Sequence, residues 1–211
     1  MTVDLKCEMI RPFAPSILRI VVPSVIIKNV NDFADNQQNK KNMKHRLVSR
    51  IEDVPQLTNE TLEHIGIKTM FEESCRHYLQ SVKGNINVDV KIISAWFNNQ
   101  IEDEYNPVHF HHSCKLSAVL YLKIPENKDR GFDNDIDGNI DFIYGTSDYS
   151  GLFVGNFCHK PMLGDLLIFP SSLFHTVYPF KGKGTRRTLA FNVDFQIIDG
   201  DLPIRFLGYS E

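Results

Sequence analysis

Two histidines spaced two residues apart form the first candidate site in this sequence. His109 and His111 lie in the stretch 105–112, just before an apolar run that has the character of a buried strand. Residues two apart in an extended segment project to the same side, so both imidazoles can reach one point. Histidine is the commonest metal ligand among side chains. The spacing predicts half of a metal site, with Phe110 and His112 facing the other way.

A loop histidine has other uses, such as hydrogen bonding to solvent or backbone, so the pair needs a third ligand from elsewhere in the chain. The stretch 163–179 supplies a candidate. It contains the apolar run Asp165 to Phe169, a proline-marked turn at Pro170 and then His175. We therefore expect His109, His111 and His175 to lie together.

A cation and a hydroxyl share one face of the segment 186–192. In an extended chain Arg186 and Thr188 point to one side with Asn192, while Arg187 points to the other. A buried guanidinium without a partner is costly, so an arginine on the inner wall of a β structure requires a carboxylate. The pattern predicts a carboxylate partner for Arg186.

Composition excludes several classes of protein. The chain has 211 residues, enough for one domain with a full core, with 42% hydrophobic and 23% charged residues. Its formal net charge of -3 offers no basic surface to a nucleic-acid backbone. We expect one domain and no nucleic-acid partner.

The cysteines and the N-terminal residues indicate where the protein works. The four cysteines are scattered without a Cys-x-x-Cys pair, which argues against a zinc ribbon and a disulfide framework; they are Cys7, Cys75, Cys114 and Cys158. The first residues are charged, and no apolar run is long enough to cross a membrane. We expect a protein of the reducing cytoplasm with no membrane partner.

The first 85 residues are predicted to be mainly helical support. Prolines limit residues 1–35 to short strands or turns before a brief helix, and residues 29–44 have little to bury and predict a solvated helix end or loop. Residues 58–82 carry an apolar stripe at helical spacing, with Thr58 as N-cap and Gly84 as the stop, so one continuous helix is expected.

The rest of the chain is predicted to be β-rich. Alternation begins at Asn85, and glycine-containing turns separate the later apolar runs, as in a sandwich or barrel. Strands are expected from about residue 86 and at 116–124, 139–144, 165–169 and 187–195.

Four blocks in this β-rich half resemble the 2-oxoglutarate and Fe(II)-dependent oxygenases, particularly a small prolyl-hydroxylase-like group found in marine bacteria and phages. The blocks are Ala95 to Asn98, Asn106 to His111 with Leu116 to Leu122, Gly164 to Pro170 with His175, and Arg186 to Asn192. In order and spacing they cover residues 86–196, about half of the chain. The resemblance implies a hydroxylase that uses Fe(II), 2-oxoglutarate and dioxygen on a small-molecule or peptide substrate.

The resemblance also implies a fold and a set of roles. The fold is mainly β with N-terminal helices: a double-stranded β-helix, or cupin-like jelly-roll barrel, over residues 86–198, buttressed by residues 1–85. The family's metal histidines fall on His109 and His175, and its Arg-x-Ser/Thr pair for 2-oxoglutarate falls on Arg186 and Thr188. A strand tyrosine that shares this carboxylate resembles Tyr121; Ser117 and Asn98 would line the same pocket.

The metal motif departs from the superfamily at one position. Most members have a carboxylate where this chain has His111, although the small group it most resembles is similar to it in having His-x-His. A third neutral imidazole leaves the site one unit more positive than the usual two-histidine, one-carboxylate site. Asp103 or Glu104 could instead complete it, although neither lies at the motif position.

Two other functions remain open on the sequence. A cupin-like dioxygenase could use the three histidines without 2-oxoglutarate, with Arg186 binding a carboxylate of the substrate. A catalytically silent jelly-roll binding module could instead hold zinc through His109, His111, His175 and Cys114.

Two loops carry weaker signals. Residues 133–141 begin like a calcium loop, but Tyr144 stands where a bidentate glutamate is expected, so an acidic hairpin turn is favoured over calcium. Residues 130–155 are long enough to form a loop that covers a substrate.

Overall fold

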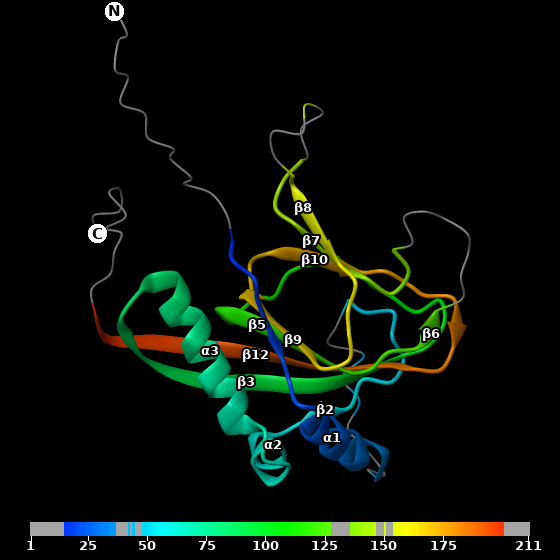
Figure 1. Ribbon diagram of the computed structural model, residues 1–211, viewed down its shortest axis with the longest axis horizontal. Coiled ribbons are helices and arrows are strands. Elements are labelled where there is room, and N and C mark those ends of the chain that lie inside the picture. The colour runs from blue at the N-terminus through cyan, green and yellow to red at the C-terminus, as the bar shows by residue number, and fades with distance from the viewer. Residues whose placement is uncertain are drawn as a thin grey trace, which may run out of the picture.

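Two antiparallel sheets face each other in the computed structural model (Figure 1), which describes residues 15–36, 42, 44, 48–127, 136–146, 150 and 154–200. The larger sheet has the order β1-β9-β5-β12-β3-β2. Its strands are β1 (Leu18–Val21), β2 (Gln56–Leu57), β3 (Ile86–Gln100), β5 (Leu116–Lys123), β9 (Asp165–Pro170) and β12 (Arg186–Gly200).

The smaller sheet has four strands in the order β4-β10-β7-β8. They are β4 (Asn106–His109), β7 (Ile140–Ile143), β8 (Asn156–His159) and β10 (Phe174–Val177), and a separate ladder joins β6 (Glu126–Asn127) to β11 (Gly182–Lys183). This confirms the mainly β, jelly-roll class of fold. Within the described residues, no hydrogen-bonded ladder joins the two sheets into a closed barrel.

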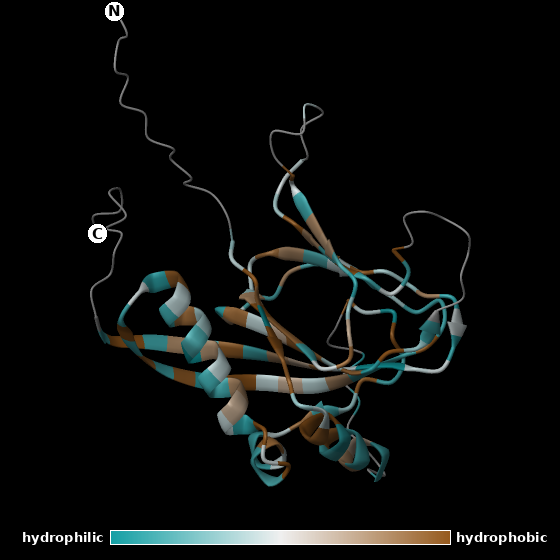
Figure 2. Ribbon diagram, viewed as in Figure 1, coloured by the Kyte–Doolittle hydropathy of each residue, from teal (hydrophilic) through white to brown (hydrophobic). Residues whose placement is uncertain are grey.

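The long strands β3 and β12 pair with each other in the larger sheet. From Ile86 to Ile93 buried and exposed side chains alternate along β3, because α3 covers only one face there. Figure 2 shows this as alternating brown and teal bands. From Ala95 to Gln100 both faces are buried, so polar side chains in this half of the strand lie inside the molecule.

Three helices cover the outer face of the larger sheet: α1 (Ser24–Asn36), α2 (Asn59–His64) and α3 (Lys68–Lys83). The main core lies between them and the sheet; the stacked rings of Phe71 on α3 and Phe191 on β12 are 4.1 Å apart. None of the described helices is both long and apolar enough to cross a membrane.

The prediction of a single helix over residues 58–82 was wrong, because two helices, α2 and α3, cover this segment. Gly66 has a φ of 75°, a left-handed conformation that breaks the helical hydrogen bonding and separates α2 from α3. Both predicted ends are confirmed. The Thr58 hydroxyl accepts a hydrogen bond from the Thr61 amide, and Gly84 ends α3 with a φ of 86°.

The solvated segment predicted from residue 29 was also partly wrong. Helix α1 continues to Asn36, and Val30 and Ala34 are buried against the sheet. Four-residue spacing places both apolar side chains on one helix face, which sequence composition alone concealed. Residues 133–135 of the calcium-like loop and residues 130–135, 147–149 and 151–153 of the possible covering loop lie outside the described residues.

A buried carboxylate joins three segments at the start of β9. Gly164 turns the chain with a φ of 86°, and a side chain there would meet the Val22 carbonyl oxygen at 2.8 Å. Asp165 then accepts hydrogen bonds from Arg19 at 2.8 Å, the Met162 amide at 2.9 Å and His159 at 2.8 Å. Burial alone would raise the pKa of Asp165, but these bonds together hold that pKa below its ordinary value.

Replacing Asp165 with asparagine should destabilise the fold in a pH-dependent way. A lowered folded-state pKa contributes stability that is complete above the unfolded-state value of about 4 and is lost as the pH falls below it. We expect Asp165→Asn to lower the free energy of unfolding by about 2 kcal/mol at pH 7 and by less at pH 3. Urea denaturation at both pH values measures this difference.

The matched control is Asp32→Asn. Asp32 pairs with Lys28 one helical turn away on the exposed face of α1, where an ion pair contributes little. An equal loss of stability in both variants, or a loss that does not change with pH, would contradict the role of Asp165.

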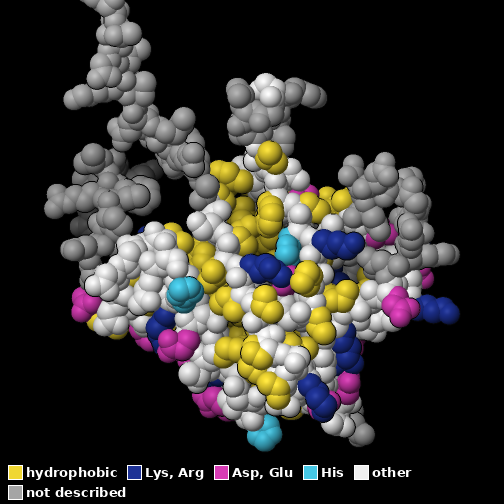
Figure 3. All heavy atoms as spheres, in the orientation of Figure 1, with side chains coloured by type: hydrophobic (Ala, Val, Ile, Leu, Met, Phe, Trp, Pro, Cys, Tyr) yellow, Lys and Arg dark blue, Asp and Glu magenta, His cyan; other side chains and the backbone are white. Residues whose placement is uncertain are grey.

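Charges of both signs are scattered around the face that Figure 3 shows, with hydrophobic side chains gathered near its centre.

Candidate metal and cosubstrate site

The three predicted histidines lie together between the two sheets. His109 at the end of β4 pairs directly with His175 on β10. His111 follows two residues later, where its amide donates to the Ser171 carbonyl at 2.9 Å. One ligand nitrogen from each histidine lies within 4.8 Å of the others, so all three can coordinate one ion.

Backbone carbonyls orient two of these imidazoles. His109 Nδ1 is 2.7 Å from the Pro107 oxygen, and His175 Nδ1 is 2.9 Å from the Leu173 oxygen. A carbonyl can only accept, so each Nδ1 carries the proton and each Nε2 keeps its lone pair for a metal. This arrangement is typical of histidines that bind a metal.

Burial keeps the cluster in its neutral, metal-binding form. It lowers the pKa of His109, it lowers that of His111 to about 4 with help from its histidine neighbours, and it lowers that of His175 to about 3. Phe169 and Phe142 surround His175, with ring centroids at 5.0 and 6.0 Å. Three neutral nitrogens in a dry pocket suit a divalent transition metal such as Fe(II).

The other proposed ligands do not join this cluster. Cys114 is absent from the group of metal-capable side chains, so the four-ligand zinc site was wrong. Asp103 pairs with Lys181, and the Glu104 carboxylate accepts from the amides of Ile101 and Glu52. Within the described residues, His111 is therefore the third potential ligand.

The flanking aromatic positions also differ from expectation. Phe110 does not face away into the core; it lines the cavity, with its ring 5.0 Å from that of Phe174 and 4.3 Å from that of His112. His112 is exposed and outside the metal-capable group. The chain leaves regular β structure after His109, so strict alternation no longer applies there.

A buried cation lies in the same cavity. Arg186 is 3% exposed, and its two terminal nitrogens donate to the Gln100 side-chain oxygen at 3.3 Å and the Tyr121 hydroxyl at 3.2 Å. Its Nε is buried without a hydrogen-bond partner. Burial disfavours the charged form of each group, so it lowers the pKa of the Arg186 guanidinium and raises the pKa of the Tyr121 hydroxyl.

The remaining predicted residues lie along the same wall. Asn98 on β3 donates to the Thr188 hydroxyl at 3.3 Å, beside Arg186. Ser117 lies farther along β5 and donates to Asn192 at 2.9 Å. The structure therefore brings all eight predicted site residues to one cavity of about 540 Å³.

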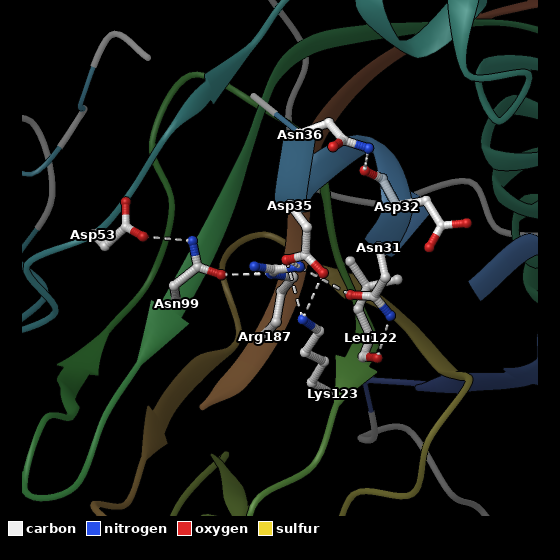
Figure 4. A network of polar contacts seen from close by, with 9 residues as sticks. All are labelled: Asn31, Asp32, Asp35, Asn36, Asp53, Asn99, Leu122, Lys123 and Arg187. Carbon is white, nitrogen blue, oxygen red and sulfur yellow. Dashed lines mark hydrogen bonds and ion pairs between the residues drawn. The ribbon is translucent and has the colours of Figure 1, made fainter. Parts of the chain in front are cut away.

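The side chain of Arg187, the next residue, lies on the opposite face of the sheet, toward α1 (Figure 4). Its guanidinium donates to Asn99 at 2.6 Å, to Asn31 at 3.1 Å and to Asp35 at 2.7 Å, which fastens α1 to the sheet. The hydrogen bond from Arg187, followed by that from Lys123, lowers the pKa of the Asp35 carboxyl. The two adjacent arginines thus have different electrostatic partners, as strand alternation predicted.

Gln100 and Asn192 contact the predicted site residues but were given no role from the sequence, although Asn192 was placed on the same face as Arg186. Gln100 at the end of β3 accepts from Arg186, and Asn192 accepts from Ser117. Alternation along β3 and β12 places both on the cavity face, so their register was the signal that could have found them. The described residues that line the cavity include no carboxylate to neutralise Arg186.

The family comparison agrees with this geometry. Residues 94–192 match the family model described as "Putative 2OG-Fe(II) oxygenase". The match contains the three histidines and the Arg186 wall, and the family that it matches consists of 2-oxoglutarate-dependent oxygenases, which are oxidoreductases. The cofactors of this family are Fe(II) and 2-oxoglutarate. A comparison with curated proteins gives no match.

Solved structures share the fold at low identity. A Pseudomonas putida prolyl-4-hydroxylase has a TM-score of 0.54 and 15% identity, covering 83% of this chain and 91% of the other. The collagen prolyl hydroxylase of Paramecium Bursaria Chlorella virus-1, in its 2OG complex, has 0.53 and 14%, covering 84% and 94%. HygX of Streptomyces hygroscopicus with nickel, 2-oxoglutarate and hygromycin B has 0.59 and 11%, covering 85% and 83%.

Proposed function

We propose that this protein is an Fe(II)- and 2-oxoglutarate-dependent hydroxylase of a peptidyl or amino-acid side chain. One observation carries the proposal: a buried arginine without a carboxylate partner shares a cavity with three neutral imidazoles, two of them oriented by backbone carbonyls. A metal ion and a dianionic keto acid together satisfy both features. The peptide preference rests on prolyl hydroxylases among the structures with this fold, one of them in complex with a peptide fragment.

Each residue then has a role. His109, His111 and His175 hold the metal; Arg186, Thr188 and Tyr121 bind the distal carboxylate of 2-oxoglutarate, and Asn98 orients the Thr188 hydroxyl. When bound, Fe(II) and 2-oxoglutarate supply the oxidising chemistry, in which dioxygen converts the keto acid to succinate and carbon dioxide and hydroxylates a C–H bond. The buried walls exclude water and fix the relative position of the two reactants.

The chain organisation and the compartment belong to the same proposal. We treat residues 1–211 as one oxygenase domain, with 86–198 as its jelly-roll core, because the helices share their main hydrophobic core with the larger sheet. The cytoplasm is proposed because Cys75, Cys114 and Cys158, the described cysteines, are unpaired.

Anaerobic titration of the Fe(II)-loaded protein with 2-oxoglutarate tests the function. Chelation of the keto acid produces a weak visible charge-transfer band, so we expect the band to appear and to saturate at one equivalent. Iron binding without a band would favour the cupin-like alternative, in which Arg186 binds a carboxylate of the substrate. Stoichiometric zinc that resists chelators after expression without added zinc would favour the silent binding module.

Gln100→Glu should weaken 2-oxoglutarate binding, and it also removes the amide nitrogen that donates to the Glu104 and Tyr178 carbonyls. The new carboxylate would lie at the position of the amide oxygen that now accepts from Arg186, so it would neutralise the guanidinium internally. We expect about a 100-fold loss of 2-oxoglutarate affinity, close to 3 kcal/mol, with iron affinity unchanged.

The same titration measures this loss, and Gln80→Glu makes the identical chemical change on the exposed side of α3. The control should bind 2-oxoglutarate as the wild type does. If Gln100→Glu also binds it normally, Arg186 does not receive the cosubstrate carboxylate.

A further inference from the structure

The end of the cavity opposite Arg186 carries a second polar pair. Ser117 on β5 and Asn192 on β12 are cross-strand partners and both line the cavity. Asn192 lies six residues from Arg186 along β12, or about 20 Å at the rise of a strand. A five-carbon diacid anchored on Arg186 and Thr188 is much shorter than this separation.

This pair lies on the metal side of the cavity. Ser117 also pairs with Phe169 of β9, whose ring centroid is 5.0 Å from that of His175. A group bound by Ser117 and Asn192 would therefore lie close to the metal-binding histidines but away from the arginine. That is the region where a primary substrate must place its reacting C–H bond.

The hydrogen-bonding capacity of the pair indicates the chemistry of its ligand. Ser117 donates to the Asn192 side-chain oxygen, and the Asn192 side-chain nitrogen has no hydrogen-bond partner among the described residues. The Ser117 hydroxyl uses its single proton in this bond, so its oxygen remains available as an acceptor. The Asn192 side-chain nitrogen therefore remains as a donor and the Ser117 oxygen as an acceptor. If the amide of Asn192 is turned over, its oxygen becomes the free acceptor and the Ser117 hydroxyl the free donor, so the pair still offers one of each.

The cavity mouth is apolar. Val48, Val108 and Phe174 line it with exposed fractions of 58%, 56% and 46%, and Phe110 packs edge-to-face against Phe174. Apart from Arg186, no lysine, arginine, aspartate or glutamate is among the described lining residues. An uncharged group therefore fits this half better than an ionised one.

We propose that Ser117 and Asn192 form a subsite for a neutral amide of the primary substrate. Its carbonyl oxygen accepts from Asn192, its N–H donates to Ser117, and an adjoining apolar group passes between Val108 and Phe174. This assignment rests on the proposed hydroxylase function. It gives Ser117 a role in binding the primary substrate instead of 2-oxoglutarate. The amide belongs to a polypeptide or to a small carboxamide.

Trp96 provides the test, because it is the only tryptophan in the chain and lines the cavity. Its fluorescence is followed in anaerobic protein loaded with Mn(II) and 2-oxoglutarate, during titration with isocaproamide, with isocaproic acid, which has the same carbon skeleton and no amide, or with acetyl-Ala-Leu-Ala-amide. The amides should bind at least about 10-fold more tightly than the free acid, as expected from one additional hydrogen bond. Tighter binding of the tripeptide assigns a polypeptide substrate, whereas equal binding of both amides assigns a small carboxamide.

Variants separate the subsite from the rest of the site. Asn192→Leu keeps the size of the side chain and should weaken amide binding about 10-fold while leaving 2-oxoglutarate affinity within about 2-fold. Asn36→Leu, at the exposed end of α1, is the matched control and should bind both as the wild type does.

Three results would overturn the inference. If Asn192→Leu weakens 2-oxoglutarate and spares the amides, the pair belongs to the cosubstrate. If wild type saturates with 2-oxoglutarate but binds neither amide, the subsite is wrong and the hydroxylase proposal stands. If wild type does not bind 2-oxoglutarate at all, the proposed function fails and the inference fails with it.

Discussion

Replacing Arg186 with leucine is expected to abolish measurable 2-oxoglutarate binding. The guanidinium offers a charged, forked donor to the distal carboxylate, and each such hydrogen bond contributes about 1.5–3 kcal/mol. Losing two of them weakens binding on the order of 1,000-fold or more. Titration of the Fe(II)-loaded variant should show no charge-transfer band at concentrations that saturate the wild type.

The same substitution should not destabilise the protein without cosubstrate. Arg186 is buried with an unpaired Nε, and leucine removes the cost of keeping that charge out of water, which offsets the loss of the hydrogen bonds to Gln100 and Tyr121. Thermal melting should therefore give an unchanged or raised Tm for Arg186→Leu. In wild type, 2-oxoglutarate should raise the Tm by mass action, and in the variant it should have no effect.

Arg187→Leu is the matched control, one residue along the same strand. It breaks the network in Figure 4 that joins Arg187 to Asp35, Asn31 and Asn99, so it should lower stability. Its 2-oxoglutarate affinity should nevertheless stay close to that of wild type. Retained affinity in Arg186→Leu, or equal loss in both variants, would sink the assignment of Arg186 to the cosubstrate.

Strand alternation explains why sequence alone could separate these two arginines. A period of two places Arg186 and Thr188 on one face, and no other arrangement is compatible with a regular strand. The same rule grouped Tyr121 with Ser117, whereas His109 and His111 lie together although the strand ends at His109. These residues meet in one cavity because the rule depends only on local geometry.

Features that depend on pairing between distant strands were not predictable in the same way. Strands β4, β8 and β10 are short, and the His109–His175 pair exists only because β4 and β10 lie side by side. Alternation places Gln100 and Asn192 on the cavity face, but their contacts with Arg186 and Ser117 follow from the cross-strand pairing. A single sequence carries alternation within a strand but does not state which strands are neighbours.

Local backbone conformation limited the helix prediction. The apolar stripe of residues 58–82 continues through Gly66, so periodicity gave no sign of the break. Glycine permits a left-handed conformation but does not require it. The packing of α2 and α3 at different positions on the sheet decides the outcome.

Replacing His175 with alanine is expected to remove metal binding. His175 is 4% exposed, and its carbonyl-bound Nδ1 fixes the ring so that Nε2 faces His109 and His111. Only two imidazoles of the site would remain, and the described cavity wall contains no carboxylate or thiol that could take the place of the third. Fe(II) affinity should fall by at least about 100-fold, measured by anaerobic calorimetry, and the 2-oxoglutarate band should disappear with it.

Two further variants decide whether the loss is specific and whether His111 is the third ligand. His77→Ala, on the exposed face of α3, should bind Fe(II) normally. His111→Asp should also retain Fe(II), because it offers one carboxylate oxygen from the same position, whereas His111→Ala should lose most of the affinity. Normal Fe(II) binding by His111→Ala would mean that two histidines suffice, and normal binding by His175→Ala would place the metal elsewhere in the protein.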